Sequence, residues 1–198
     1  SGREGDLHRK NGGLNSVPPF AEKTVKVYNG RVEALASILD FLKDQKEKYV
    51  IMSEANLAAN FDFKAMLNAH IESGADVTLA YAQEEIPEGL IKPFDVNKDL
   101  YYTLDIEDGR VREIQINPEE PGIQNLSLNI YIIERELLIS QISAAFVRGY
   151  VYFERDILAP QPDKLNVRGY KFGGYIARIS SFKSYFDENM KLLDEENM

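Results

Sequence analysis

The stretch from Tyr49 to Gln83, YVIMSEANLAANFDFKAMLNAHIESGADVTLAYAQ, decides the fold of this chain. It begins with an apolar run, residues 49–53, of the kind that forms a strand buried on both faces. Residues at helical spacing follow, between Asp62, which can cap a helix, and Gly74, which can end one in a left-handed conformation. Residues 75–81 resemble a second strand. The stretch therefore predicts a strand–helix–strand unit with a right-handed parallel crossover.

The residues that end the first of these strands, Ser53-Glu54-Ala55-Asn56, are the first candidates for a site. Ligands of α/β sheets bind beyond the carboxyl ends of the strands, which is where this tetrapeptide falls. Its chemistry is therefore central to any functional hypothesis.

The remainder of the chain continues the alternation of strands and helices. A hairpin is predicted from the polarity alternation of residues 100–106 and 110–116 around Asp108-Gly109. Other elements follow from apolar spacing: strands at 25–28, 126–133 and 175–179, an extended segment at 165–172, a helical turn at 153–158, and helices at 32–42, 137–146 and 182–193. The predicted fold is one α/β domain, residues 1–198, with a mixed sheet flanked by helices and an inserted β-hairpin.

Composition narrows the class of protein. The 198 residues suffice for one α/β domain with a core, and 44% apolar with 28% charged residues is ordinary for a globular protein. No apolar run approaches the roughly 20 residues of a membrane span. The chain has no cysteine, which excludes disulfides and thiolate metal sites and fits a cytoplasmic protein. A net charge of −9 argues against a nucleic-acid partner.

Short motifs follow one another in a recognisable order. They are Val17-Pro18-Pro19, Tyr28 to Ala34, Ser53 to Asn56, His70 to Thr78, Ile116-Asn117-Pro118, Ser127 to Tyr131, Phe153 to Pro160 and Gly174 to Ser181. This collinear set resembles the nucleotidyltransferase domain of ADP-glucose pyrophosphorylases (glucose-1-phosphate adenylyltransferases). The family counterparts include Ser-Gly-Asp-His, Glu-Lys-Pro, Ser-Met-Gly-Ile-Tyr, Asp-Phe-Gly and Gly-Tyr-Trp-x-Asp. The resemblance implies a Rossmann-like, glycosyltransferase-A-type fold.

The resemblance also implies that family parts are missing. The family's first strand and glycine-rich phosphate loop lie before the position of Ser1, and its C-terminal left-handed β-helix lies after Met198. The first strand is central in the family's sheet. We therefore expect unpaired strand edges and uncovered apolar surface, relieved by self-association or by residues outside this chain.

Three parts of the catalytic apparatus implied by the resemblance are replaced. The family's two Mg²⁺-binding aspartates align with Ala55, or Glu54 if the loop shifts by one residue, and with Arg178. A guanidinium about 4 Å from Mg²⁺ would be repelled by roughly 8 kcal/mol at an effective dielectric of 20. The lysine of Glu-Lys-Pro, which would anchor the sugar phosphate, is Asn117. We therefore expect no bound Mg²⁺, no other cofactor and no catalytic residue at these degenerate positions.

Other positions keep family residue types. The resemblance implies substrate-binding roles for Tyr28, Ser127, Gly174 and Tyr175. Tyr28 either stacks on a nucleotide, as its counterpart does, or packs as an ordinary aromatic residue. Arg178 binds an anionic effector or a partner subunit, or pairs with a nearby acid.

His70 lies on the apolar face of the predicted helix, without a second metal-ligand residue nearby. This placement favours a packing role for the imidazole over a role as a ligand.

Three functional hypotheses follow. The first is a non-catalytic regulatory subunit that forms a hetero-oligomer with a catalytic adenylyltransferase in glycogen synthesis and responds to a small-molecule effector. The short forms Ser-Glu-Ala-Asn and Gly-Tyr-Ile-Ala-Arg-Ile-Ser-Ser resemble such bacterial subunits. The second is an active nucleotidyltransferase with shifted metal ligands, and the third is a nucleotide or sugar-phosphate sensor without an enzyme partner.

We predict that this chain alone has no detectable adenylyltransferase activity, because the metal aspartates and the phosphate lysine are replaced together. The measurement is pyrophosphate release from ATP and glucose 1-phosphate. A turnover within about a hundredfold of a typical enzyme rate of roughly 10 s⁻¹ would contradict the prediction and support the second hypothesis.

Overall fold

The computed structural model describes residues 23–28, 32–54, 61–86, 102–116, 120–173 and 187–194. The helical elements are α2 (Val32–Ala36), α3 (Leu39–Lys43), α5 (Phe63–Ser73), α6 (Arg135–Val147) and the π-helix η3 (Phe153–Leu158). The strands are β1 (Lys23–Tyr28), β2 (Tyr49–Glu54), β3 (Val77–Ile86), β4 (Tyr102–Glu107), β5 (Arg110–Ile116), β6 (Gly122–Glu134), β7 (Val167–Lys171) and β8 (Asp187–Leu193). Among these helices, none is long and apolar enough to cross a membrane.

The strands form one mixed sheet in the order β1-β8-β2-β6-β3-β7-β5-β4. Of the described pairings, β3–β7 is parallel and the others are antiparallel. Strand β4 also pairs with β6, through Thr103 and Leu126, so that β6, β3, β7, β5 and β4 close into a ring. The mixed α/β arrangement confirms the predicted class, whereas the closure of the ring was not predicted from the sequence.

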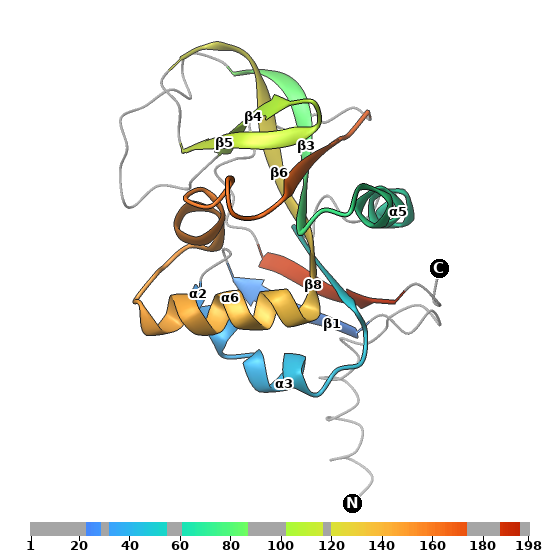
Figure 1. The fold of residues 1–198 in the computed structure, drawn as a ribbon, viewed down its shortest axis with the longest axis vertical. Helices are drawn as coiled ribbons and strands as arrows, with labels where there is room; N and C mark the ends of the chain where they lie inside the picture. Colours follow the sequence, from blue (N-terminus) through green and yellow to red (C-terminus); the bar gives the residue numbers. More distant parts are fainter. Residues whose placement is uncertain are drawn as a thin grey trace, which may run out of the picture.

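Helices cover both faces of the sheet and create two hydrophobic cores. Consecutive residues of β2 alternate between them: Val50 and Met52 join the core under α2, α3, α6 and η3, whereas Tyr49 and Ile51 join the core under α5. Figure 1 shows α2, α3 and α6 on one side of the strands and α5 on another. Residues 49–53 are all at most 4% exposed, which confirms a strand buried on both faces.

The predicted unit of strand, helix and strand is present. Asp62 caps α5 by accepting a hydrogen bond from the backbone N–H of Ala65 at 3.1 Å, and Gly74 ends it with a φ of 67°. Strands β2 and β3 run parallel to each other because both are antiparallel to β6, which lies between them. The crossover therefore spans an intervening strand.

The predicted hairpin is also present, as β4 and β5. Glu107 pairs with Arg110 across a two-residue loop, in which Asp108 and Gly109 have φ angles of 52° and 79°. Two positive φ angles define the tight turn that Asp-Gly favours. A Cβ at Gly109 would lie 2.6 Å from Nη2 of Arg168, at the flexible end of that side chain, so the positive φ is the stronger reason for glycine here. The hairpin supplies the two strands that close the ring.

The prediction of a final helix at 182–193 is wrong, because residues 187–193 form strand β8 between β1 and β2. The apolar spacing of this segment fits a helix, but two rows of backbone hydrogen bonds outweigh it. Leu192 is buried in one core, and the next residue, Leu193, packs against the other. Opposite faces for consecutive residues are the property of a strand.

The position of β8 also removes one reason for expecting self-association. Strand β2 is hydrogen-bonded on both edges, by β6 and by β8, and β8 pairs with β1 as well. The unpaired backbone groups expected beside a missing strand are therefore not found on β2. Self-association itself stays a prediction.

The helix predicted at 32–42 is divided into α2 and α3. The hydroxyl of Ser37 donates to the carbonyl of Ala34 at 2.6 Å, and the N–H of Ile38 bonds to the carbonyl of Leu35 at 3.2 Å. A serine side chain that bonds to a nearby carbonyl competes with the helical pattern. The burial of Val32, Leu35 and Leu42 shows that both pieces keep the predicted apolar face.

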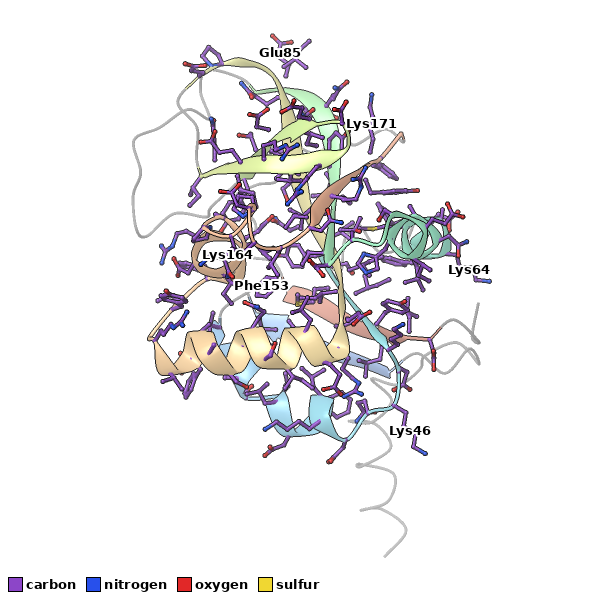
Figure 2. The ribbon with its side chains drawn as sticks, viewed as in Figure 1. Lys46, Lys64, Glu85, Phe153, Lys164 and Lys171 are labelled. Atoms are coloured by element: carbon purple, nitrogen blue, oxygen red, sulfur yellow. The ribbon has the colours of Figure 1, made fainter. Side chains whose placement is uncertain are left out.

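Five other predictions are confirmed, and several lie outside the described residues. Strands β1 and β6 cover the predicted strands at 25–28 and 126–133, and β7 lies within the extended segment at 165–172. Helix α6 covers the helix at 137–146, and η3 the turn at 153–158. Figure 2 shows Phe153 between η3 and α6, whereas Lys46, Lys64 and Glu85 lie at the periphery. The motif Val17-Pro18-Pro19 and the strand expected at 175–179 lie outside the described residues.

Arg135 joins the start of α6 to the chain between α3 and β2. Its Nη1 donates to the carbonyl of Leu42 at 2.9 Å, its Nε to that of Glu47 at 2.8 Å, and its backbone N–H to that of Lys48 at 2.7 Å. The side chain is only 12% exposed. One guanidinium thus bonds to a carbonyl in the last turn of α3 and to another in the segment that leads to β2.

We expect the variant Arg135→Met to lower the free energy of unfolding by about 2 kcal/mol, because two charge-assisted hydrogen bonds are lost. Urea denaturation measures the change. Arg112→Met is the control, since Arg112 forms an exposed ion pair with Glu107 at 3.7 Å and should change stability by less than about 0.5 kcal/mol. Equal effects of the two variants would show that Arg135 is an ordinary surface residue.

Candidate functional site

The carboxyl end of β2 forms one wall of the candidate site. Pairing with β6 ends at Met52 and Tyr131, just before Ser53, whereas pairing with β8 continues to Glu54. Ser53 is fully buried, and its hydroxyl has no hydrogen-bond partner among the described residues. A buried hydroxyl without a partner is costly, so this strand end is a place where a polar group would be accommodated.

A bulge in β6 forms the second wall. Leu79 of β3 pairs with Tyr131, and Tyr81 pairs with Ser127, so that β6 advances four residues while β3 advances two. Asn129, within the bulge, has a φ of 55°. The hydroxyl of Ser127 accepts a hydrogen bond from the backbone N–H of Asn129 at 3.3 Å. The bulge thus interrupts the ladder where β2 ends, as bulges beside functional sites often do.

The π-helix η3 contributes a carboxyl group to the bulge. The hydroxyl of Ser127 donates to Oε1 of Glu154 at 2.8 Å, and the two residues are only 2% and 3% exposed. Next to Glu154, Phe153 is fully buried and its ring lies 5.6 Å from that of Tyr131. Glu154 therefore reaches the bulge from an element that is packed onto the same strand.

Asp156 holds the start of η3 in place. Its Oδ2 accepts hydrogen bonds from the backbone N–H groups of Val151 and Tyr152, both at 2.9 Å, and Arg155 donates to both of its oxygens. Burial acts to raise the pKa of Asp156, but the hydrogen bonds from Arg155 and from the backbone outweigh it and lower the pKa. The carbonyl of Val151 also accepts from the N–H of Val32 at 2.7 Å, which fastens this segment to the start of α2.

The structure places some of the predicted site residues and leaves others outside the described ranges. Ser127 is buried in the bulge, Glu54 ends β2 beside Glu188, and the backbone of Tyr28 pairs with that of Asp187 in β1 and β8. The other candidates, Ala55, Asn117, Gly174, Tyr175 and Arg178, lie outside the described residues. Their roles stay predictions.

Sequence reasoning did not single out Asn129 and Glu154 as parts of the site. Asn129 stands where the family motif Ser-Met-Gly-Ile-Tyr has glycine, and asparagine shares with glycine a tolerance of positive φ. Glu154 stands beside Phe153, Ile157 and Leu158, which are all buried. A glutamate amid apolar residues is a signal of a buried carboxyl group, although the sequence does not name its partner.

Sequence comparison with known proteins identifies the family of this chain. The family model for nucleotidyl transferases matches residues 8–195. The chain belongs to the nucleotidyl transferase family. It is 29% identical over 199 residues to a glucose-1-phosphate adenylyltransferase of Bacillus mycoides (strain KBAB4), covering 98% of this chain and 51% of that protein. It is also 29% identical over 196 residues to the Geobacillus stearothermophilus glucose-1-phosphate adenylyltransferase, covering 97% and 49%. This nucleotidyl transferase chain spans about half the length of these relatives.

His70 of this nucleotidyl transferase domain lies in the core under α5, away from the bulge. Its Nδ1 is 2.6 Å from Oγ1 of Thr78, and the ring of Tyr49 meets its ring edge-on at 5.6 Å. Burial lowers the pKa of His70 from 6.5 to about 4, and the nearby Asp76 only partly offsets this effect. These contacts agree with the predicted packing role of this histidine.

We predict that stability falls by on the order of 2 kcal/mol as the pH drops from 6.5 towards 4. In that window the unfolded chain binds a proton at His70 and the folded chain does not. Urea denaturation at several pH values measures the slope. The variant His70→Gln should have a shallower slope below pH 6.5, and an unchanged slope would contradict a neutral, buried imidazole.

We also predict that Asn129→Gly is more stable than Asn129→Ala by about 1 kcal/mol, because only glycine takes a positive φ without strain. Both variants lose the same side-chain contacts, so their difference isolates the backbone. The same pair of substitutions at Gln124, which lacks a positive φ, should give the opposite order. Thermal or urea unfolding measures the stability of each variant. If glycine were more stable than alanine at both positions, or less stable at both, strain at Asn129 would be ruled out.

Proposed function

We propose that this chain is a non-catalytic, regulatory partner of a glucose-1-phosphate adenylyltransferase and acts in ADP-glucose and glycogen synthesis. The observation that carries the proposal is the joint replacement of charged family positions by Ala55, Asn117 and Arg178 in a chain that belongs to the nucleotidyl transferase family. The relatives are named glucose-1-phosphate adenylyltransferases, which supports this reaction as the one that the partner performs. The replacements argue that this chain does not perform it. We further propose the Rossmann-like, glycosyltransferase-A-type variant of the fold.

The residues at the family's metal positions do not fit a divalent cation. Mg²⁺ prefers carboxylate and other oxygen ligands, whereas Ala55 offers a methyl group and Arg178 a cation. Glu54 is a carboxylate at the end of β2, but a single carboxylate is a weak donor set. We therefore propose that the chain binds no Mg²⁺ in the manner of the active enzymes, and no metal-assisted step is assigned to it.

The bulge supports the same conclusion. Ser127, a substrate position in the resemblance, is 2% exposed and donates its only hydroxyl proton to Glu154. A substrate oxygen would have to displace that carboxyl group before it could accept from Ser127. The hydroxyl of Ser127 thus has no second proton to donate to a substrate oxygen.

A non-catalytic chain that keeps the fold acts through a partner. We propose a hetero-oligomer with a catalytic adenylyltransferase subunit in the cytoplasm, with a small-molecule effector as an additional ligand. Effector binding would then change the affinity of the complex for its substrates, and substrate binding would change its affinity for the effector by the same factor. Neither a nucleic acid nor a membrane enters this proposal.

A second candidate function is an active nucleotidyltransferase with shifted metal ligands. It is favoured by Glu54, which lies at the carboxyl end of β2, where ligands of such sheets bind. It needs a second carboxylate near Glu54, and Glu188, which pairs with Glu54 between β2 and β8, is a candidate among the described residues.

Kinetics of a mixture test the proposal. The chain is added in increasing amounts to a catalytic adenylyltransferase from the same cell, and pyrophosphate release is followed at several concentrations of each substrate. We expect a saturable change in KM or kcat of at least about twofold. The chain without the enzyme and the enzyme with bovine serum albumin are the controls. No change at saturation, with no co-purification, would reject the proposed partnership.

A further inference from the structure

The contact between Ser127 and Glu154 has a property that the family resemblance does not explain. A serine hydroxyl has one proton to donate, and Ser127 donates it to Oε1 of Glu154 at 2.8 Å. The hydroxyl oxygen of Ser127 also accepts a hydrogen bond from the N–H of Asn129 at 3.3 Å. Both sides of the hydroxyl are therefore engaged within the protein, at a position where the resemblance implies a ligand.

Glu154 is held beside Ser127 by its neighbours along the chain. Phe153, Ile157 and Leu158 are at most 1% exposed and belong to one core. Burial of such apolar side chains stabilises the packed position of η3, so η3 cannot move away from β6 without a large cost. Asp156 fixes the start of the helix through two backbone N–H groups. The carboxyl group of Glu154 is thus a built part of the bulge.

The residue type at 154 departs from the motif that surrounds it. In Asp-Phe-Gly a glycine follows the phenylalanine, whereas here Glu154 follows Phe153. A glycine leaves open the space that a glutamate side chain fills. The substitution therefore adds volume and two oxygen atoms at the buried side of Ser127.

We propose that Glu154 acts as an internal substitute for a ligand: its carboxyl group takes the position beside Ser127 that an oxygen of a sugar phosphate would take. A carboxyl oxygen and a phosphoryl oxygen both accept hydrogen bonds from a serine hydroxyl, so one excludes the other. Glu154 is in this view a specificity-determining residue that closes the site to sugar phosphates. The inference rests on the proposed non-catalytic function and deepens it, because it names the residue that prevents substrate binding.

Binding measurements on the whole chain test the inference. Glucose 1-phosphate and inorganic phosphate are titrated separately to about 10 mM and followed by calorimetry and amide NMR shifts. The variant Glu154→Ala removes the carboxyl group, and Glu154→Gln is the matched control, because its amide oxygen still accepts from Ser127. We expect Glu154→Ala to bind glucose 1-phosphate at least about tenfold more tightly than the wild type or Glu154→Gln.

The double variant Glu154→Ala/Ser127→Ala should lose the gained affinity, which assigns the gain to the hydroxyl of Ser127. Circular dichroism checks that each variant is folded. If Glu154→Ala does not fold, Glu154→Val is titrated in its place, since it also lacks an oxygen that could accept from Ser127 and fills part of the space left by the carboxyl group. The same expectations then apply to it.

Three results would overturn the inference. They are equal binding by the alanine and glutamine variants, binding by the wild type as tight as by Glu154→Ala, and a gain for inorganic phosphate without one for glucose 1-phosphate. This test does not involve a partner enzyme. Failure of the kinetic effect in the mixture would therefore reject the regulatory partnership without deciding the role of Glu154. Failure of the binding test would reject the role of Glu154 without deciding the partnership.

Discussion

The pairing of β6 with β2 on one edge and β3 on the other is the constraint on which the rest of the structure depends. Because β6 is antiparallel to both, the two strands joined by α5 run parallel with their carboxyl ends at one edge of the sheet. The same strand carries residues of both cores, Tyr131 and Ile133 on one face and Ile130 and Ile132 on the other. A slip of one residue in its register would exchange these faces, so the pairing is strongly specified.

The bulge is a local departure from this regular pairing, and it has a chemical consequence. By adding residues to β6 opposite β3, it turns Ser127 towards η3, where Glu154 receives its hydrogen bond. The packing of Phe153 against Tyr131 sets the height of η3 over the strand. Backbone geometry, aromatic packing and one buried polar contact thus converge on the place where the family resemblance expects a ligand.

Membership of the nucleotidyl transferase family is compatible with the proposed loss of its charged positions, because the two depend on different parts of the chain. The fold rests on buried apolar residues of β2, β3 and β6. The chemistry rests on a few charged side chains at strand ends, which can change without a cost to the core. Asn129 illustrates this difference. It stands where the family motif Ser-Met-Gly-Ile-Tyr has glycine, and its backbone has the positive φ of the bulge.

Local signals in the sequence determined much of the fold: the buried β2, the Asp62 cap and Gly74 end of α5, and the turn at Asp108-Gly109 are decided by residues close together in the chain. Only the tertiary structure decided that residues 187–193 are a strand, because their hydrogen-bond partners lie more than a hundred residues away in β1 and β2. The tertiary structure alone also decided the ring closed by Thr103 and Leu126 and the contact between Ser127 and Glu154. Sequence periodicity reports which residues prefer burial, whereas the partner of a strand edge or of a buried hydroxyl is set by how the whole chain packs.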